Sequence, residues 1–425
     1  MTAVDDAYDA ARRIWNGMID RKPTLIARCV SPDDVRAAVK LARAERMPVS
    51  VRGGGHGVAG TAVCDGGIMI DLSAMKSIRV DPDAREAIAE PGVLWGEFDR
   101  ATQTHGLATT GGQVSHTGIA GLTLGGGLGY LMGKHGATCD NLLSVDIVTA
   151  DGEMLTASTE ENPDLFWAVR GAGANFGVVT SFRYRLHPIS QVLAGLLLHP
   201  RERAPELIAF HREFLASSPD ELDTTIGFLN SPEGAPLVGI VVVYAGPESE
   251  GERILAPLRK FGPPVADLVR PMPYTEVQSM LDNAVPTGDR YYWKSNFVAE
   301  LAPGFADVLT EGATAMPSPQ SMILLFEMKE RFTALAKMPW RSITATPILS
   351  YPSSPIGPIR VAMLQILSGR AKYGAARSCS FLLPCTRIIW PRTKHQIGCE
   401  RLTARISTTN WWLLRPNTIP TISSG

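Results

Sequence analysis

A glycine-rich loop holds the first residue that could do chemistry. The apolar stretch Val49–Val51 runs directly into Arg52-Gly53-Gly54-Gly55-His56-Gly57. Backbone N–H groups in such a strand-to-loop turn can hold a diphosphate, and the missing side chains let the ligand come close. His56 would then lie beside the bound group. Taken alone, however, a histidine in a glycine loop is more often an ordinary surface-turn residue.

Two further segments are also dominated by small residues. Thr109–Tyr130 is rich in glycines and hydroxyl side chains, which suits packing against phosphate and sugar, and Gly171–Gly177 is the second such segment. A dinucleotide fingerprint, G-x-G-x-x-G, has to follow a strand and open a helix. Here Gly171–Gly177 lies between an expected helix and an expected strand, and its last glycine comes one residue late. A Rossmann nicotinamide site is therefore not expected.

Cys139, within Gly136–Leu142, is the remaining candidate, although a single cysteine is more often a small buried hydrophobic residue. The eight histidines and six cysteines form no H-E-x-x-H or C-x-x-C pattern, so we expect no metal site. The G-x-S-x-G and Walker-type motifs are also absent from the sequence. These absences argue against a serine hydrolase of that type and a P-loop nucleotidase.

Length and composition limit the class of protein. The chain has 425 residues, of which 45% are hydrophobic and 20% charged, as in a globular protein of two or three domains. A net charge of −1 argues against a basic nucleic-acid binder, and no apolar run is long enough to cross a bilayer. The acidic N-terminus does not resemble a secretory signal. We expect a cytoplasmic protein without a nucleic-acid or membrane partner, and the oligomeric state is left open.

The elements around the glycine clusters predict an α+β domain over residues 1–189. Twenty of the 40 glycines fall between residues 52 and 140, and strand-like apolar segments separate their clusters. A flexible linker has no such segments, so these glycines indicate main chain wrapped around a ligand. The strands expected are Ile26–Val30, Val49–Val51, Ile68–Leu72, Ile78–Val80 and Gly177–Leu186, and the helices expected follow Ser31, Leu94 and Asn162.

Residues 190–337 predict a second α+β domain, an antiparallel sheet with helices. Its expected helices are Glu206–Leu215, Gly251–Lys260 and Tyr274–Leu281, and its expected strands include Val238–Tyr244 and Ser321–Glu327. The glycines no longer cluster in this region. This domain would supply a second wall to any site on the first.

Taken together, the first 190 residues resemble the flavin-linked oxidases of the vanillyl-alcohol-oxidase superfamily, in the berberine-bridge-enzyme-like branch. The matching segments are Val51–His56, Ile70–Met75, Thr117–Asn141 and Asn162–Thr180. The resemblance implies an FAD-binding domain of the PCMH type, in two α+β lobes with FAD extended between them.

The resemblance also implies roles for individual residues. The family's R-G-G-G-H histidine bonds to the flavin 8α-methyl group and its G-x-x-C-D-N cysteine bonds to flavin C6. His56 and Cys139 occupy these positions, so a bicovalent FAD is implied. The other residues expected to contact FAD are Arg52, Gly53, Gly54, Gly55, Gly57, Gly112, Ser115, Thr117, Gly118, Gly121, Gly125, Gly126, Asn141, Gly173, Asn175, Gly177, Val178 and Val179.

The chemistry implied is hydride transfer from a small-molecule substrate to flavin, assisted by a base, followed by reduction of O2 to H2O2. Substrates in this branch are alcohols, sugars and secondary metabolites. Arg290–Ser295 resembles a family segment near the active site, which makes Tyr292 and Lys294 candidate catalytic residues. The competing interpretation is that both are ordinary strand residues with an exposed lysine.

Residues 338–425 depart from the family pattern. The segment has one acidic residue, Glu400, against 11 Lys and Arg, and it lacks the family's tyrosine-bearing strand and Y-D-P-x-N-x-F ending. One explanation is a genuine basic tail, which could tether the flavoprotein to nucleic acid. The other, which the composition favours, is a shift of reading frame near Met338. If the catalytic segment is missing, the chain could be an FAD-binding protein without full catalysis.

Overall fold

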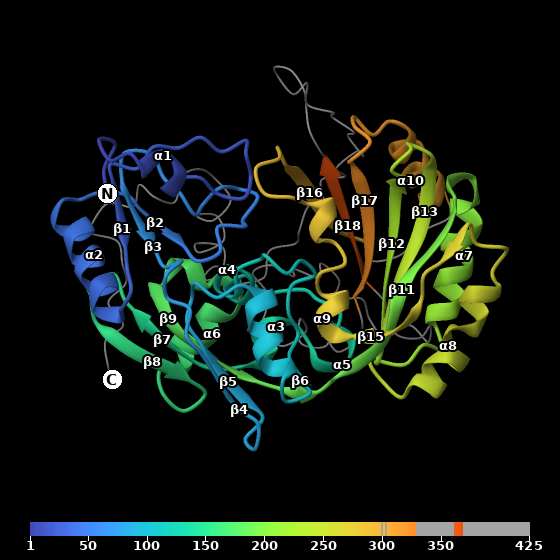
Figure 1. The fold of residues 1–425 in the computed structure, drawn as a ribbon, viewed down its shortest axis with the longest axis horizontal. Helices are drawn as coiled ribbons and strands as arrows, with labels where there is room; N and C mark the ends of the chain where they lie inside the picture. The colour runs from blue at the N-terminus through green and yellow to red at the C-terminus, as the bar shows by residue number, and fades with distance from the viewer. Residues whose placement is uncertain (299–300, 302–303, 329–360, 369–425) are drawn as a thin grey trace, which may run out of the picture. The chain divides into compact units, whose positions relative to one another are not determined.

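The computed structural model of the protein describes residues 1–298, 301, 304–328 and 361–368 (Figure 1). All of these residues lie within one compact unit, Met1–Ala371. The described elements form two lobes in the first half of the chain and a large antiparallel sheet in the second half. The α+β fold class expected from the sequence is confirmed.

The first lobe is a small parallel sheet covered by a helix. Its strands β1 (Leu25–Arg28), β3 (Ile68–Asp71) and β2 (Val49–Arg52) are ordered β1-β3-β2. Helix α2 (Pro32–Ala44) connects β1 to β2 and begins at a capping box, in which Ser31 Oγ accepts from the Asp34 N–H at 3.2 Å. The helix buries its apolar face against β3, and β2 delivers Arg52 into the glycine loop.

The second lobe is an antiparallel sheet with helices on it. Its strand order is β4-β5-β9-β7-β8, and two short strands, β6 and β10, pair outside this sheet. Helices α3 and α4 pack beside it and carry the loops of the candidate site. The elements are β4 (Ile78–Asp81), β5 (Glu86–Ala89), α3 (Trp95–Gln103), β6 (Leu107–Ala108), α4 (Ile119–Leu124), α5 (Met132–His135), the 3-10 turn η1 (Thr138–Asn141), β7 (Leu142–Val148), β8 (Met154–Ser158), α6 (Pro163–Ala172), η2 (Gly173–Asn175), β9 (Val178–Arg185) and β10 (His187–Pro188).

The second half of the chain is built on an eight-stranded sheet in the described region, and it is here called the substrate domain after the role that the sequence resemblance implies. The main order is β14-β11-β13-β12-β17-β18-β16, with β15 paired to β11, and every pairing is antiparallel. The elements are β11 (Gln191–Pro200), η3 (Arg201–Arg203), α7 (Ala204–Leu215), β12 (Leu222–Asn230), β13 (Pro236–Tyr244), α8 (Glu248–Lys260), β14 (Ala266–Asp267), β15 (Arg270–Pro273), α9 (Tyr274–Val277), η4 (Asp282–Ala284), β16 (Tyr292–Val298), α10 (Phe305–Thr314), β17 (Met322–Met328) and β18 (Val361–Ser368).

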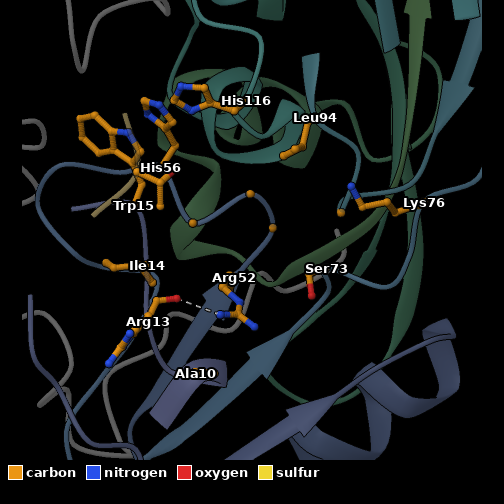
Figure 2. A pocket seen from close by; sticks show the side chains of 15 residues that line it. Ala10, Arg13, Ile14, Trp15, Arg52, His56, Ser73, Lys76, Leu94 and His116 are labelled. Atoms are coloured by element: carbon orange, nitrogen blue, oxygen red, sulfur yellow. Dashed lines mark hydrogen bonds between the residues drawn. The ribbon is translucent and has the colours of Figure 1, made fainter. Parts of the chain in front are cut away.

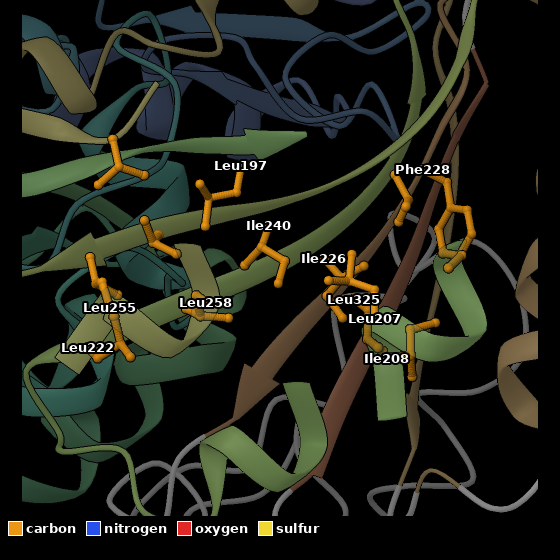
Figure 3. Close-up of a cluster of buried hydrophobic side chains, with 14 of the residues drawn as sticks. Leu197, Leu207, Ile208, Leu222, Ile226, Phe228, Ile240, Leu255, Leu258 and Leu325 are labelled. Carbon is orange, nitrogen blue, oxygen red and sulfur yellow. The ribbon is translucent and has the colours of Figure 1, made fainter. Parts of the chain in front are cut away.

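The core of the substrate domain lies between this sheet and its helices (Figure 3). Leu207 and Ile208 from α7 and Leu255 from α8 are buried against strand residues such as Ile226 and Ile240. All five side chains are at most 4% exposed. One face of the sheet is thereby used for the domain's own core, and the other face is left for the first half of the chain.

Two features of the substrate domain differ from the sequence-based expectation. The helix expected over Tyr274–Leu281 ends at Val277, because the chain tightens into i→i+3 hydrogen bonds, such as Met280 N to Val277 O at 3.2 Å. The strand β18 lies in a stretch for which no element was expected, and it pairs with both β16 and β17. The rest of 338–425 lies outside the described residues, so both explanations of that segment stay hypotheses.

The described residues include no helix long and apolar enough to cross a membrane.

Candidate functional site

A cavity of about 410 Å³ lies where the glycine loop after β2 meets the N-terminal segment (Figure 2). Arg52–His56 form one side of it, Trp15 and Arg13 another, and His116 and Thr287 also line it. No acidic side chain lines the cavity, whereas three basic ones do. The charge of its lining therefore suits an anionic ligand.

The glycine loop packs backbone against backbone. A Cβ on Gly54 would lie 2.5 Å from Gly118 Cα, and Gly55 has a φ of +68°, so side chains at these positions would clash or strain the chain. Within the described part of the chain, the backbone N–H groups of residues 53–57 donate no hydrogen bond. Successive unpaired N–H groups in a turn form an anion-binding nest. This geometry is compatible with a bound diphosphate, and the contact itself stays a prediction from the sequence.

Arg52 fixes the start of this loop. Its Nε donates to Asp71 Oδ1 at 2.9 Å, a second nitrogen pairs with the other carboxylate oxygen, and Nη1 donates to the carbonyls of Ala11 and Arg13. Burial acts to raise the pKa of Asp71, but the hydrogen bonds and charge of Arg52 outweigh it and the pKa is lowered. The guanidinium therefore ties the N-terminal segment to β3, which is a role in positioning the loop.

His56 is held in an aromatic stack. Its ring lies on Trp15 with centroids 4.1 Å apart, Trp15 lies in turn on Tyr291 at 3.8 Å, and His116 is 4.9 Å from His56. The Nε2 atom of His56 is buried and has no hydrogen-bond partner within the described residues. Burial, with a smaller contribution from His116, lowers the pKa of His56 to about 3. The imidazole is thus neutral at physiological pH, with one nitrogen unused.

Cys139 lies on a different segment, the η1 turn. Its N–H donates to the Gly126 carbonyl at 2.9 Å, and Asn141 braces the turn by donating to the carbonyls of His135 and Ala137. The Cys139 side chain is 8% exposed and is not part of the lining of the His56 cavity. The Asn141 amide is used within the turn, with its oxygen 2.7 Å from His187 Nε2.

The remaining predicted cofactor contacts fall into two groups. The first comprises glycines that allow close chain packing. A Cβ on Gly173 would lie 2.5 Å from Leu124, and one on Gly177 would lie 2.4 Å from the Val148 carbonyl. The second group differs in burial. The buried members are Val178 and Val179 of β9, Gly112 and Gly118. The half-buried or exposed members are Thr117, Asn175, Gly57, Gly121, Gly125 and Gly126.

Tyr292 and Lys294 lie on the face of β16 opposite to Trp293. Trp293 contacts Trp15 edge-on, at 5.5 Å between ring centroids. Strand residues alternate between the two faces of a sheet. Lys294 and Ile323 are both paired with residue 366 of β18, so Lys294 lies on the same face as Ile323, which is the face covered by helices. Tyr292 is 54% exposed and has the Lys294 ammonium 5.5 Å from its ring. The structure does not bring this pair to the His56 cavity.

Several residues of the site had no sequence signal. Trp15 lies before the first strand, outside every motif. Tyr291 lies within Arg290–Ser295, a segment singled out for Tyr292 and Lys294. Asp282 is 167 residues away from Ser115, to which it is hydrogen-bonded. Each is recognised only through contacts between distant parts of the chain. Among the described residues, no group of three or more His, Cys, Asp or Glu side chains could hold a metal ion.

Comparison with known proteins agrees with these features. A family model described as an FAD binding domain matches residues 23–158. An FAD-linked oxidoreductase of Dictyostelium discoideum is 35% identical over 314 residues, which cover 73% of this chain and 68% of that protein. The chain belongs to the FAD-linked oxidoreductases. The expected resemblance to the berberine-bridge-enzyme-like flavoenzymes is thereby confirmed.

Solved structures share the fold of this FAD-linked oxidoreductase. The structure of 6-hydroxy-D-nicotine oxidase from Arthrobacter nicotinovorans has a TM-score of 0.74 and 29% identity, over 88% of this chain and 81% of that one. A berberine-bridge-enzyme-like protein of Physcomitrella patens has a TM-score of 0.72 and 20% identity, over 87% and 81% of the two chains. The nest at residues 53–57 and the unpartnered Nε2 of His56 fit FAD, since a dinucleotide offers both a diphosphate and a flat ring system.

Proposed function

We propose that the protein is an oxidase, which removes hydride from a C–H bond of an alcohol, a sugar or a secondary metabolite and passes the electrons to O2, giving H2O2. Family membership and the likeness to 6-hydroxy-D-nicotine oxidase support this proposal. The single observation that carries it is the buried Nε2 of His56, unpartnered within the described residues, beside the loop 53–57 of unpaired backbone N–H groups, because this arrangement fits FAD.

When bound, FAD would supply the hydride acceptor and the donor of electrons to oxygen. The chain's own part is to hold and orient it. The N–H groups of residues 53–57 would donate to the diphosphate, and Arg13, which has no ion-pair partner within the described residues, would add positive charge on the cavity wall. Trp15 and Tyr291 would keep the His56 ring in one orientation.

His56 would form a covalent bond to the 8α-methyl carbon of the flavin. A neutral imidazole is the nucleophilic form, and the low pKa of His56 keeps it neutral across the physiological range. The bond replaces one methyl C–H bond and the imidazole N–H bond, and the two electrons set free pass to oxygen. Covalent attachment would tie the flavin to the His56 side chain, whose own ring orientation Trp15 sets.

Cys139 would form a second link, to flavin C6. The N–H groups of Cys139 and Thr138 donate to the carbonyls of Gly126 and Gly127, which fixes the backbone of the η1 turn. The position of Cys139 therefore depends on the glycine turn at 125–127, part of which the sequence predicts to contact the cofactor. The link replaces a ring C–H bond and the thiol S–H bond, again with oxygen as the electron acceptor. The two links are separate proposals, because the two residues lie on different segments.

Tyr292 and Lys294 stay the sequence-based candidates for the base that takes the substrate proton. For either to act, its side chain would have to reach from the face of β16 opposite to Trp293. Substrate would approach from the substrate-domain side, where Trp293 contacts the aromatic stack.

Turnover with a panel of alcohols, sugars and heteroaromatic amines tests the proposed reaction. We expect at least one class to reduce the protein's flavin without oxygen, and to give one H2O2 per O2 consumed when oxygen is present. Reduction by substrate without reoxidation by O2 would instead identify a dehydrogenase. Bound flavin that no substrate reduces would favour the alternative, an FAD-binding protein without catalysis.

A further inference from the structure

A short segment of the substrate domain reaches the loop that carries His116. Gln278 and Asp282 lie four residues apart, after α9, and both side chains contact this loop. Gln278 Nε2 donates to the Gly112 carbonyl at 3.0 Å. Asp282 accepts hydrogen bonds from Ser115 N at 2.8 Å and from Ser115 Oγ. The loop is therefore held at both ends by one segment of the other domain.

Ser115 is also held from within the flavin-binding half. Its carbonyl accepts from the Gly96 N–H at 2.8 Å, and a Cβ on Gly96 would lie only 3.0 Å from the Ser115 Cβ. The donors of Ser115 face Asp282 and its acceptor faces α3, so its backbone position is fixed on both sides. The next residue, His116, lines the cavity and lies 4.9 Å from His56. A shift of Ser115 would therefore displace a wall of the His56 cavity.

Gln278 is anchored by a second buried group. Its Nε2 also donates to Asp99 Oδ2 of α3 at 3.1 Å, and both side chains are 1% exposed. A hydrogen bond broken at such depth leaves its partners without water to replace it. The hydrogen bonds of Gln278 to Asp99 and Gly112 therefore hold the two domains together at one position. Asp282, four residues after Gln278, adds a second contact at Ser115, next to His116.

We propose that Gln278 and Asp282 are positioning residues of the flavin site. They clamp the loop 112–116 from the substrate domain and so set the place of His116 against His56. This inference rests on the proposed function, in that it takes the His56 cavity as the site of the flavin. It goes further in assigning part of the cofactor environment to the substrate domain, so that a movement of that domain reaches the flavin through Ser115.

Full-length Asp282→Ala and Ser115→Ala variants test the clamp, with Glu276→Gln as a matched control. Glu276 is a carboxylate on the same segment whose partner is Arg270 at the surface. The readouts are the flavin-to-protein ratio and the visible absorption and circular dichroism of the bound flavin. Asp282→Ala removes both hydrogen bonds from Ser115, so we expect it to lower the ratio by about tenfold or more, since tenfold is the factor for one charge-assisted hydrogen bond, and to shift the flavin bands.

Two further variants distinguish a loss of loop positioning from a loss of folding. Asp282→Asn keeps an acceptor for Ser115 N, so we expect it to recover part of the flavin content and band position. Ser115→Ala combined with Asp282→Ala is expected to behave like Asp282→Ala alone, because Asp282→Ala already removes both hydrogen bonds that Ser115 donates. Unchanged flavin content and bands in Asp282→Ala would overturn the clamp while leaving the proposed function standing. A wild-type protein that binds no FAD would instead overturn the proposed function.

Discussion

The imidazole of His56 lies on the indole of Trp15, with ring centroids 4.1 Å apart and planes 15° from parallel. Trp15 is itself fixed, because its Nε1 donates to the Val285 carbonyl at 3.0 Å and its other face lies on Tyr291. The orientation of a residue from the flavin-binding half is thus set by a tryptophan that the substrate domain holds in place.

Replacing Trp15 by alanine is expected to reduce both stability and covalent flavin. Trp15 is 3% exposed, so its loss should lower the free energy of unfolding by about 3–5 kcal/mol. Without the indole the His56 ring is free to turn, so the fraction of protein with acid-stable flavin should fall. Chemical denaturation and flavin fluorescence on denaturing gels measure the two effects. Trp167→Ala, at a 38% exposed tryptophan, is the control and should leave covalent flavin unchanged.

Arg52→Ala is expected to be strongly destabilising. It removes the hydrogen-bonded guanidinium from the Asp71 carboxylate, which is 1% exposed, and leaves only Arg28, at 4.0 Å, as its ion-pair partner among the described residues. Breaking one side of a buried ion pair costs about 3–5 kcal/mol, and the remaining Arg28 contact favours the lower end of that range. Arg52 also donates hydrogen bonds to the Ala11 and Arg13 carbonyls, so its loss should loosen the N-terminal segment that carries Trp15. Trp15 should then become more exposed to solvent, which quenching of tryptophan fluorescence measures. The exposed Arg79→Ala serves as the comparison. Equal denaturation midpoints for the two variants would contradict the positioning role of Arg52.

Asp99 is expected to make stability depend on pH. Burial raises the pKa of Asp99 to about 7, so between about pH 4 and pH 7 the folded state binds a proton that the unfolded state does not. This group's contribution to stability is therefore largest below pH 4 and is lost as the pH rises to 7, at about 1.4 kcal/mol per pKa unit. Asp99→Asn removes it, so the variant should gain stability relative to wild type with rising pH.

Urea denaturation at a series of pH values measures this difference. The exposed Asp83→Asn is the control and should follow the wild-type curve. A parallel pair of curves for Asp99→Asn and wild type would show that Asp99 does not bind the proton.

Tyr292→Phe and Lys294→Met test the sequence-based catalytic assignment. The register of β16 places both side chains on the face opposite to Trp293, so we expect turnover to change by less than about twofold, within what a surface change gives. Steady-state rates at saturating substrate are the measurement. A loss of about a hundredfold, the size expected on removing a general base, would instead support the sequence-based assignment of these residues.

Local signals predicted those parts of the fold that depend on neighbouring residues. The Ser31-Pro32 start of α2 and the strand before Arg52 were found because caps, prolines and apolar periods act within a few residues. The glycine loop was predicted to be a phosphate-binding turn from the same kind of local signal, and that role stays a prediction. By contrast, β18 and the end of α9 depend on pairing partners and contacts far away in the chain.

The candidate site was only half predictable for the same physical reason. His56 and Cys139 came from a resemblance of whole motifs, since neither residue alone indicates a flavin. Trp15 and Asp282 came from neither source, because their partners lie on distant segments. Ser115 was expected to contact the cofactor, yet both of its donors face Asp282.

Mass spectrometry of the proteolysed holoprotein tests the central claim most directly. The protein is precipitated with acid, freed of unbound flavin and digested, and the peptide that contains His56 is examined. We predict that this peptide carries the mass of the flavin, that the Cys139 peptide is cross-linked to it through the same flavin, and that His56→Ala leaves only the cysteinyl link. An unmodified His56 peptide from a protein that was yellow before precipitation would contradict the assignment of His56 as the covalent anchor.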